Sequence, residues 1–180
     1  MELYTRMFTP QEVATATGLE AKSIHNWATR GLIVGQRDAV GKGHTRMFSW
    51  FNVMEVAVAA ALMEIGMNSP QDAFAGTRLF SHSGDGGSGW AQDDAIADDD
   101  DLRLPALPYH HSAGVTFLFV WKEGAEVRLS KDGTIDLHSI RPEYSRATGF
   151  IVLNLSELFA RVAYRLGCDY RVLLDQAYEK

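Results

Sequence analysis

Two sets of side chains in the first fifty residues could bind an anionic partner. A segment over about residues 20–29 has the spacing of an amphipathic helix, with Ile24 and Trp27 on its inward face. Its outward polar and basic positions are Lys22, Ser23, His25, Asn26 and Arg30. The second set lies in and beside a glycine-rich loop, residues 35–43. The loop contains the cations Arg37 and Lys42, and Arg46 follows it. Cations on such a backbone are typical of a hairpin close to phosphate groups.

A different set of residues could support catalysis or metal binding: His82, His110, His111, His138 and Cys168. Such sites need several of these groups to converge, and the sequence contains no HExxH, no CxxC and no glycine-rich phosphate loop. Neighbouring side chains of an extended segment point apart, so we expect at most one of His110 and His111 to serve a given site. We therefore expect no catalytic residue, no metal site, no cofactor and no enzymatic activity, and we interpret Cys168 as a packing residue.

An acidic stretch contains a further candidate for cation binding. Residues 85–101 carry seven aspartates and no basic residue. The side chains that could hold a divalent cation loosely are His82, Asp85, Asp93 and Asp94. The abundance of Gly, Ser and Asp over residues 81–101 favours a linker instead, because this composition buries too little apolar surface to offset chain entropy. The aspartates could also compete for the basic loop, although a solubilising tether is the simpler interpretation.

The overall composition is that of a globular chain. Of its 180 residues, 46% are hydrophobic and 22% are charged, which excludes wholesale disorder, collagen and a disulfide-stapled miniprotein. One cysteine, no signal-peptide pattern and no apolar run of about 18–20 residues favour a cytoplasmic protein without a membrane partner. The net charge of −6 argues against nonspecific nucleic-acid binding over the whole surface. However, residues 1–50 carry +2 and residues 85–101 carry −7, so the acidity belongs to one segment.

The N-terminal unit, residues 1–80, is expected to be mainly helical. Thr9 and Glu12 form a capping-box pattern that predicts a helix start, and Gly18 is a typical helix end. The expected elements are helices over 10–17 and 20–29, a strand over 32–34, a hairpin returning through 46–48, a buried helix over 50–65 and a helix over 70–80. The first two helices predict a helix-turn-helix.

The C-terminal unit, residues 102–180, is expected to be a small α+β domain. The expected strands cover residues 114–121, 125–129, 134–140 and 150–153, and the turn at 130–133 predicts a hairpin. Asn154 then caps an amphipathic helix that Gly167 ends, and a short helix over 170–178 follows. The fold class is therefore α+β. After the acidic linker, the chain is expected to form an antiparallel meander covered by a helix.

The N-terminal pattern resembles a known family. FTPQEVATATGLEAKSIHNWATRGLI at residues 8–33 and GKGHTRMFSWFNVMEVAVAAALMEIGMNSPQDA at 41–73 are similar to the winged helix-turn-helix domain of bacterial MerR-family transcription regulators. Two departures stand out. His25 and Asn26 occupy positions where family members usually have an arginine and an aromatic residue. A Gly/Asp-rich linker replaces the long dimerisation helix of the metal and drug sensors. With one cysteine in the chain, metal sensing through several cysteines is not expected.

The resemblance implies that a homodimer binds double-stranded DNA. Lys22, Ser23, His25 and Asn26 would read base edges in the major groove, where asparagine suits adenine and lysine suits guanine or a phosphate. The residues expected to hold the DNA backbone are Arg30, Arg37, Lys42, His44, Thr45 and Arg46. Dimerisation through the C-terminal unit would double these contacts on a two-fold site. RNA polymerase and an unidentified small-molecule effector are further partners of such a regulator.

Two other functions remain open at this point. Short winged helices also serve phage excisionases and terminase-like packaging factors, which bend or mark DNA. Alternatively, the C-terminal sheet or the acidic linker could bind a protein partner, which would make the chain an interaction adaptor.

Overall fold

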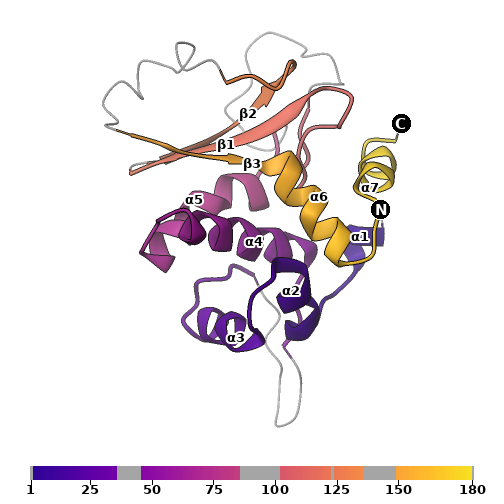
Figure 1. Ribbon diagram of the computed structural model, residues 1–180. Coiled ribbons are helices and arrows are strands. Elements are labelled where there is room, and N and C mark those ends of the chain that lie inside the picture. Colours follow the sequence, from indigo (N-terminus) through magenta and orange to yellow (C-terminus); the bar gives the residue numbers. More distant parts are fainter. Residues whose placement is uncertain (1, 36–45, 86–101, 123, 136–148, 180) are drawn as a thin grey trace.

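Helices gather at the N-terminal end of the chain, and a small sheet with two further helices completes the fold (Figure 1). The computed structural model describes residues 2–35, 46–85, 102–122, 124–135 and 149–179. The helices of the N-terminal part are α1 (Glu2–Thr5), α2 (Pro10–Thr17), α3 (Ala21–Thr29), α4 (Trp50–Glu64) and α5 (Pro70–His82). The later elements are β1 (Val115–Trp121), β2 (Gly124–Ser130), β3 (Ile151–Asn154), α6 (Leu155–Arg165) and α7 (Tyr170–Ala177). The α+β prediction is confirmed.

The ends of α2 form as their sequence predicts. The Glu12 N–H donates to the Thr9 hydroxyl oxygen at 3.2 Å, and the Thr9 N–H donates to the Glu12 carboxylate at 2.8 Å. These two bonds form a capping box that satisfies backbone donors at the helix start. At the other end Gly18 adopts φ +76°, a left-handed conformation that glycine adopts without steric cost. The short helix α1 was not predicted.

The predicted strand over residues 32–34 is wrong. The Leu32 N–H instead donates to the Trp27 carbonyl at 3.0 Å and closes the end of α3. The Val34 N–H and C=O bond to side chains of α4, so neither group is available for a strand ladder. On the returning side, Phe48 forms an isolated antiparallel bridge with Phe8.

The sheet has the strand order β2-β1-β3, with both pairings antiparallel. This order corrects the predicted meander, because β3 pairs with β1, the first strand of the sheet. Thr134 and Ile135 are not in a strand, and the rest of the predicted strand over 134–140 lies outside the described residues. Leu118 and Val120 of β1 join the main core, and the helices lie on one side of the sheet (Figure 1).

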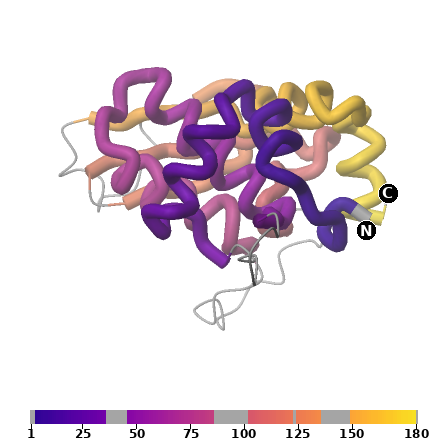
Figure 2. Tube along the Cα trace, turned by 90° about the horizontal axis from the view of Figure 1, so that it is seen from below, coloured from indigo at the N-terminus to yellow at the C-terminus, as the bar shows by residue number. Residues whose placement is uncertain are grey.

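One continuous core joins the N-terminal helices to the C-terminal elements. Trp50 of α4 and Phe159 of α6 are both fully buried, and their rings meet edge to face with centroids 5.8 Å apart. The Trp50 indole N–H also donates to the Ala106 carbonyl at 3.2 Å. The chain ends near its beginning, with α7 beside α1 in both views (Figures 1 and 2).

The described residues on either side of the acidic segment contact each other. The Asp85 N–H donates to the Arg103 carbonyl at 3.0 Å, and the Arg103 N–H donates to the Asp85 carboxylate at 3.2 Å. The buried Arg103 guanidinium also donates to the Phe80 carbonyl at 3.1 Å, near the end of α5. Residues 86–101 lie outside the described residues, so the linker and the two-unit division remain predictions. In the described ranges no helix has the length and apolar character needed to cross a bilayer.

Candidate nucleic-acid interface

The turn between α2 and α3 fixes the direction of α3 relative to α2. The Gly18 N–H donates to the Ala14 carbonyl at 2.8 Å and ends α2. A Cβ built at Gly18 would lie 2.8 Å from the Arg165 Nη1 atom, so the guanidinium of α6 lies directly over this turn. Arg165 also approaches the Ala16 carbonyl, with its Nη1 atom 3.5 Å from that oxygen. Helix α6 of the C-terminal part thus contacts the helix-turn-helix at its turn.

Helix α3 separates its side chains into a buried face and an exposed face. Ile24, Trp27 and Ala28 are buried, and the Trp27 ring packs edge to face on Phe74 with a centroid distance of 5.3 Å. Of the residues predicted to contact DNA, the exposed ones in this region are Lys22, His25, Asn26 and Arg30, and Ser23 is half-buried. Positions three and four residues apart share one helix face. The structure therefore places the predicted reading residues on one surface.

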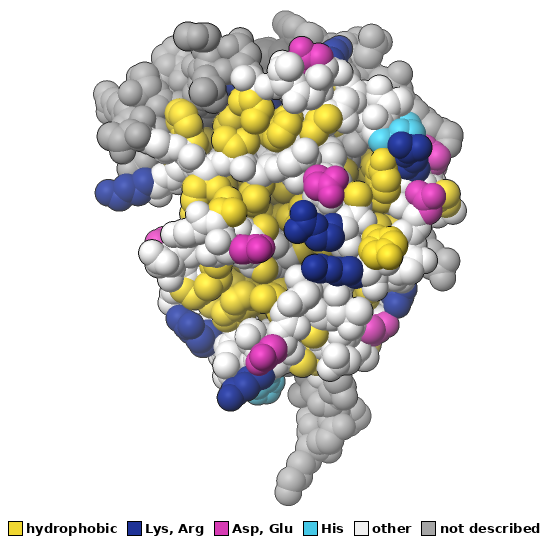
Figure 3. Space-filling model, viewed as in Figure 1, with side chains coloured by type: hydrophobic (Ala, Val, Ile, Leu, Met, Phe, Trp, Pro, Cys, Tyr) yellow, Lys and Arg dark blue, Asp and Glu magenta, His cyan; other side chains and the backbone are white. Residues whose placement is uncertain are grey.

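This surface lies at the end of the molecule opposite the sheet (Figure 1). A basic side chain and a histidine side chain lie over α3 in the space-filling view (Figure 3). Lys22 and Arg30 are its described cations, and the exposed Glu20 precedes α3. The positive charge of the described surface is therefore small. Affinity for a polyanion must come from placed contacts more than from a general field.

Two polar residues of α4 hold the segment where the predicted wing begins. Asn52 and Glu55 are 1% and 0% exposed. Asn52 Nδ2 donates to the Val34 carbonyl at 2.6 Å, and the Val34 N–H donates to Glu55 Oε2 at 3.1 Å. Sequence reasoning did not identify this pair. The available signal was two polar residues, three positions apart, on one face of an otherwise apolar helix.

The remaining wing residues are only partly placed. Arg46 is half-buried and lies two residues before the Phe48 bridge to Phe8. The other four predicted wing contacts lie outside the described residues: Arg37, Lys42, His44 and Thr45. Both described ends of the predicted wing are thus anchored, one to α4 through Val34 and the other to Phe8.

A capping interaction also shapes the charge near α2. Backbone hydrogen bonding from Thr9, together with the Arg6 side chain, lowers the pKa of the Glu12 carboxyl. Arg6 Nη2 lies 2.9 Å from Glu12 Oε1. Arg6 is therefore already paired within the protein.

The structure describes only two residues of the cation site that the sequence offers as an alternative to a linker. His82 Nε2 lies 3.4 Å from Glu55 Oε2, whereas Asp85 pairs with Arg103 at 3.7 Å. The two ligands taken from the described part of the chain thus face different partners. The other two, Asp93 and Asp94, lie outside the described residues.

The expectation for the adjacent histidines is also wrong. His110 Nε2 and His111 Nε2 lie 3.0 and 2.8 Å from the same oxygen, Oδ1 of Asp175. The physical reason is a turn, in which the Ala113 N–H donates to the His110 carbonyl at 2.9 Å, so this segment is not extended. Hydrogen bonds from His111 and His110 lower the pKa of the Asp175 carboxyl.

Two further candidates from the sequence were Cys168 and His138. Cys168 is half-buried, with its sulfur 3.7 Å from the Leu166 carbonyl oxygen, which fits a packing role. His138 lies outside the described residues.

Comparison with known families agrees with the geometry of α2, α3 and α4. Residues 8–71 match the model of the MerR HTH family regulatory proteins. The N-terminal region is a MerR-type helix-turn-helix domain. The match begins at the Phe8 bridge and ends in the first turn of α5, so it covers the exposed surface of α3. A MerR-type domain is a DNA-binding domain of transcription regulators. A search of curated proteins returned no match.

Proposed function

We propose that this chain is a sequence-specific transcription regulator that places α3 in the DNA major groove. The observation that carries the proposal is the exposed polar face of α3 within a MerR-type domain. A helix about 10–12 Å wide fits a groove about 12 Å wide. The buried Trp27 and the Gly18 turn hold this helix from the protein side.

Side chains on this face have complementary roles in the proposal. Asn26 can form a bidentate pair with an adenine edge, and Lys22 suits guanine or a phosphate. Ser23 and His25 are the other proposed reading residues. The proposed backbone contacts are Arg30, Arg37, Lys42, His44, Thr45 and Arg46. Contacts to the DNA backbone position the protein without carrying sequence information.

The regulator acts as a homodimer in this proposal. A surface with few described cations gains affinity when two copies bind half-sites about 34–36 Å apart. The C-terminal part is the proposed interface. Phe150 is exposed there, as is Leu79 on the adjoining helix α5. Hydrophobic side chains gather over the sheet and α5 on one face (Figure 3). Contact with RNA polymerase and binding of an effector are further parts of the proposal, to be tested by transcription in a purified system.

Selection from a random duplex pool tests the proposal directly. We expect enrichment of a two-fold site and an affinity that falls steeply with salt, because each phosphate contact releases counterions. Lys22→Ala should weaken binding, and the matched variant Lys131→Ala should not, because Lys131 is exposed after β2, at the opposite end of the molecule from α3 (Figure 1). No salt-sensitive affinity for any duplex would refute the proposal. DNA bending without any effect on transcription would support the architectural alternative.

A further inference from the structure

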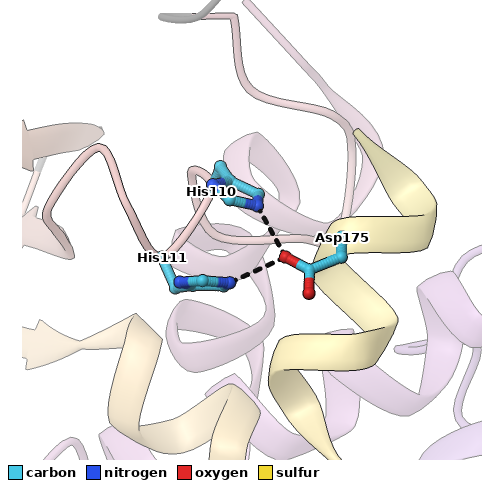
Figure 4. A group of neighbouring side chains, drawn as sticks. All are labelled: His110, His111 and Asp175. Atoms are coloured by element: carbon cyan, nitrogen blue, oxygen red, sulfur yellow. Dashed lines mark hydrogen bonds and ion pairs between the residues drawn. The ribbon is translucent and has the colours of Figure 1, made fainter. Parts of the chain in front are cut away.

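A turn and a helix far apart in the sequence bring three ligand atoms together. His110 Nε2, His111 Nε2 and a carboxylate oxygen of Asp175 all lie within 4.8 Å of one another. Figure 4 shows both imidazole rings directed at the same Asp175 oxygen, with the histidines on the turn and the aspartate on α7. The ring centroids of the two histidines are 4.2 Å apart.

The two nitrogen–oxygen distances are close to those around a bound transition metal ion. With metal–nitrogen and metal–oxygen bonds of about 2.0–2.2 Å, ligand atoms in a tetrahedral site lie roughly 3.4 Å apart. The present nitrogen–oxygen distances of 3.0 and 2.8 Å therefore need to widen by only a few tenths of an ångström. Two imidazoles and one carboxylate form a ligand set that suits zinc and neighbouring first-row divalent ions.

The surroundings orient the His110 ring. Ser112 Oγ lies 2.7 Å from His110 Nδ1, and the Ser112 N–H donates to the same nitrogen at 3.2 Å, so Nδ1 accepts here and Nε2–H faces Asp175. Metal binding at Nε2 moves the proton to Nδ1, where the Ser112 hydroxyl can accept it in place of the backbone donor. Tyr178, at the end of α7, donates its hydroxyl to the Pro108 carbonyl at 2.6 Å and packs edge to face on His110. The turn and α7 are therefore already docked.

We propose that His110, His111 and Asp175 form a binding site for one divalent transition metal ion of the zinc class. The side chains of His111 and Asp175 are 31% and 42% exposed, so an ion can enter from solvent. Three protein ligands leave at least one position for water or a small ligand. The bound ion crosslinks the turn at 110–113 to α7. The proposal does not depend on DNA binding.

Calorimetric titration of the 180-residue chain with Zn²⁺, after a chelator has removed any bound metal, tests the site. Co²⁺ supplies a second readout, because its visible absorption reports coordination by protein ligands. We expect one ion per chain. His111→Ala and Asp175→Asn should each weaken Zn²⁺ binding by at least about 100-fold, since even the loss of a supporting hydrogen bond costs about 10–100-fold. Ser112→Ala should weaken it within that smaller range.

Asp72→Asn is the matched control, because it removes an exposed carboxylate from the first turn of α5 and should leave the affinity unchanged. Far-UV circular dichroism of each variant establishes that the fold is retained. If the unmodified protein binds no Zn²⁺, or if His111→Ala and Asp175→Asn bind as tightly as Asp72→Asn does, the proposal is overturned. The DNA affinity of the same proteins is measured in parallel. A loss of Zn²⁺ binding can then be told apart from a failure of the proposed regulatory function.

Discussion

Replacing Phe159 by alanine tests whether the C-terminal helix α6 stabilises the DNA-binding domain. Phe159 is fully buried, and its ring packs edge to face on Trp50, the first residue of the long helix α4. Because Trp50 belongs to the family-matched region, the loss of its packing partner should lower the stability of the helix-turn-helix.

The magnitude follows from the burial of the side chain. Truncating a buried phenylalanine to alanine typically costs about 3–5 kcal/mol, since transfer and cavity terms add. The upper part of that range applies here because the exposed fraction of Phe159 is 0% and the Trp50 ring loses its contact. Domains of this size are stable by about 5–15 kcal/mol, so Phe159→Ala should remove a large share of the free energy of unfolding.

Urea unfolding followed by circular dichroism measures this change, and hydrogen exchange locates it. We expect one transition at a lower urea midpoint and faster exchange at the protected amides of α2, α3 and α4. Tyr164→Ala is the matched control, because Tyr164 lies on the same helix and is 82% exposed. Its effect should stay within about 0.5 kcal/mol.

One result would refute this reasoning. If Phe159→Ala destabilised only the sheet and α6 while amide protection in α2, α3 and α4 stayed unchanged, the two parts would be independent folding units. The contacts of the continuous core with α6 would then not stabilise the DNA-binding domain.

Three further predictions concern the interface and its support. Asn26→Ala should change the sequence preference of selected DNA, because asparagine can read a base edge; an unchanged preference would remove it from the reading set. Asn52→Ala should cost about 1–3 kcal/mol in thermal unfolding by leaving the Val34 carbonyl without its partner, and should also lower DNA affinity. Glu12 has a lowered pKa because the Thr9 N–H bonds to its carboxylate. Its stabilising effect should therefore be present above its unfolded pKa and disappear as the pH falls through its folded pKa. Urea unfolding of Glu12→Gln across this range should show a weaker pH dependence.

Helix boundaries were accessible from the sequence because their determinants are local. The Thr9–Glu12 capping box joins residues three positions apart, and Gly18 ends α2 through its own backbone conformation. The same holds for Asn154, which accepts the Glu157 N–H at the start of α6. The split of α3 into buried Ile24 and Trp27 and an exposed polar face also followed from helical spacing.

Strand pairing and the polar clusters depended on contacts between distant residues. The sequence predicted β3, but its placement beside β1 depends on which apolar faces pack together in the folded chain. Likewise, the local pattern predicts a strand at Val34, because no local signal shows that side chains of α4 bond to its backbone groups.

The sequence by itself determined a MerR-type helix-turn-helix and the buried and exposed faces of α3, because caps, glycine positions and helical periodicity act over a few residues. Tertiary structure alone decided that α6 supports this domain through Phe159 and that His110 and His111 meet Asp175. Asp175 lies 65 residues from His110 along the chain. Such contacts form only when the whole core has packed, so residue spacing cannot predict them.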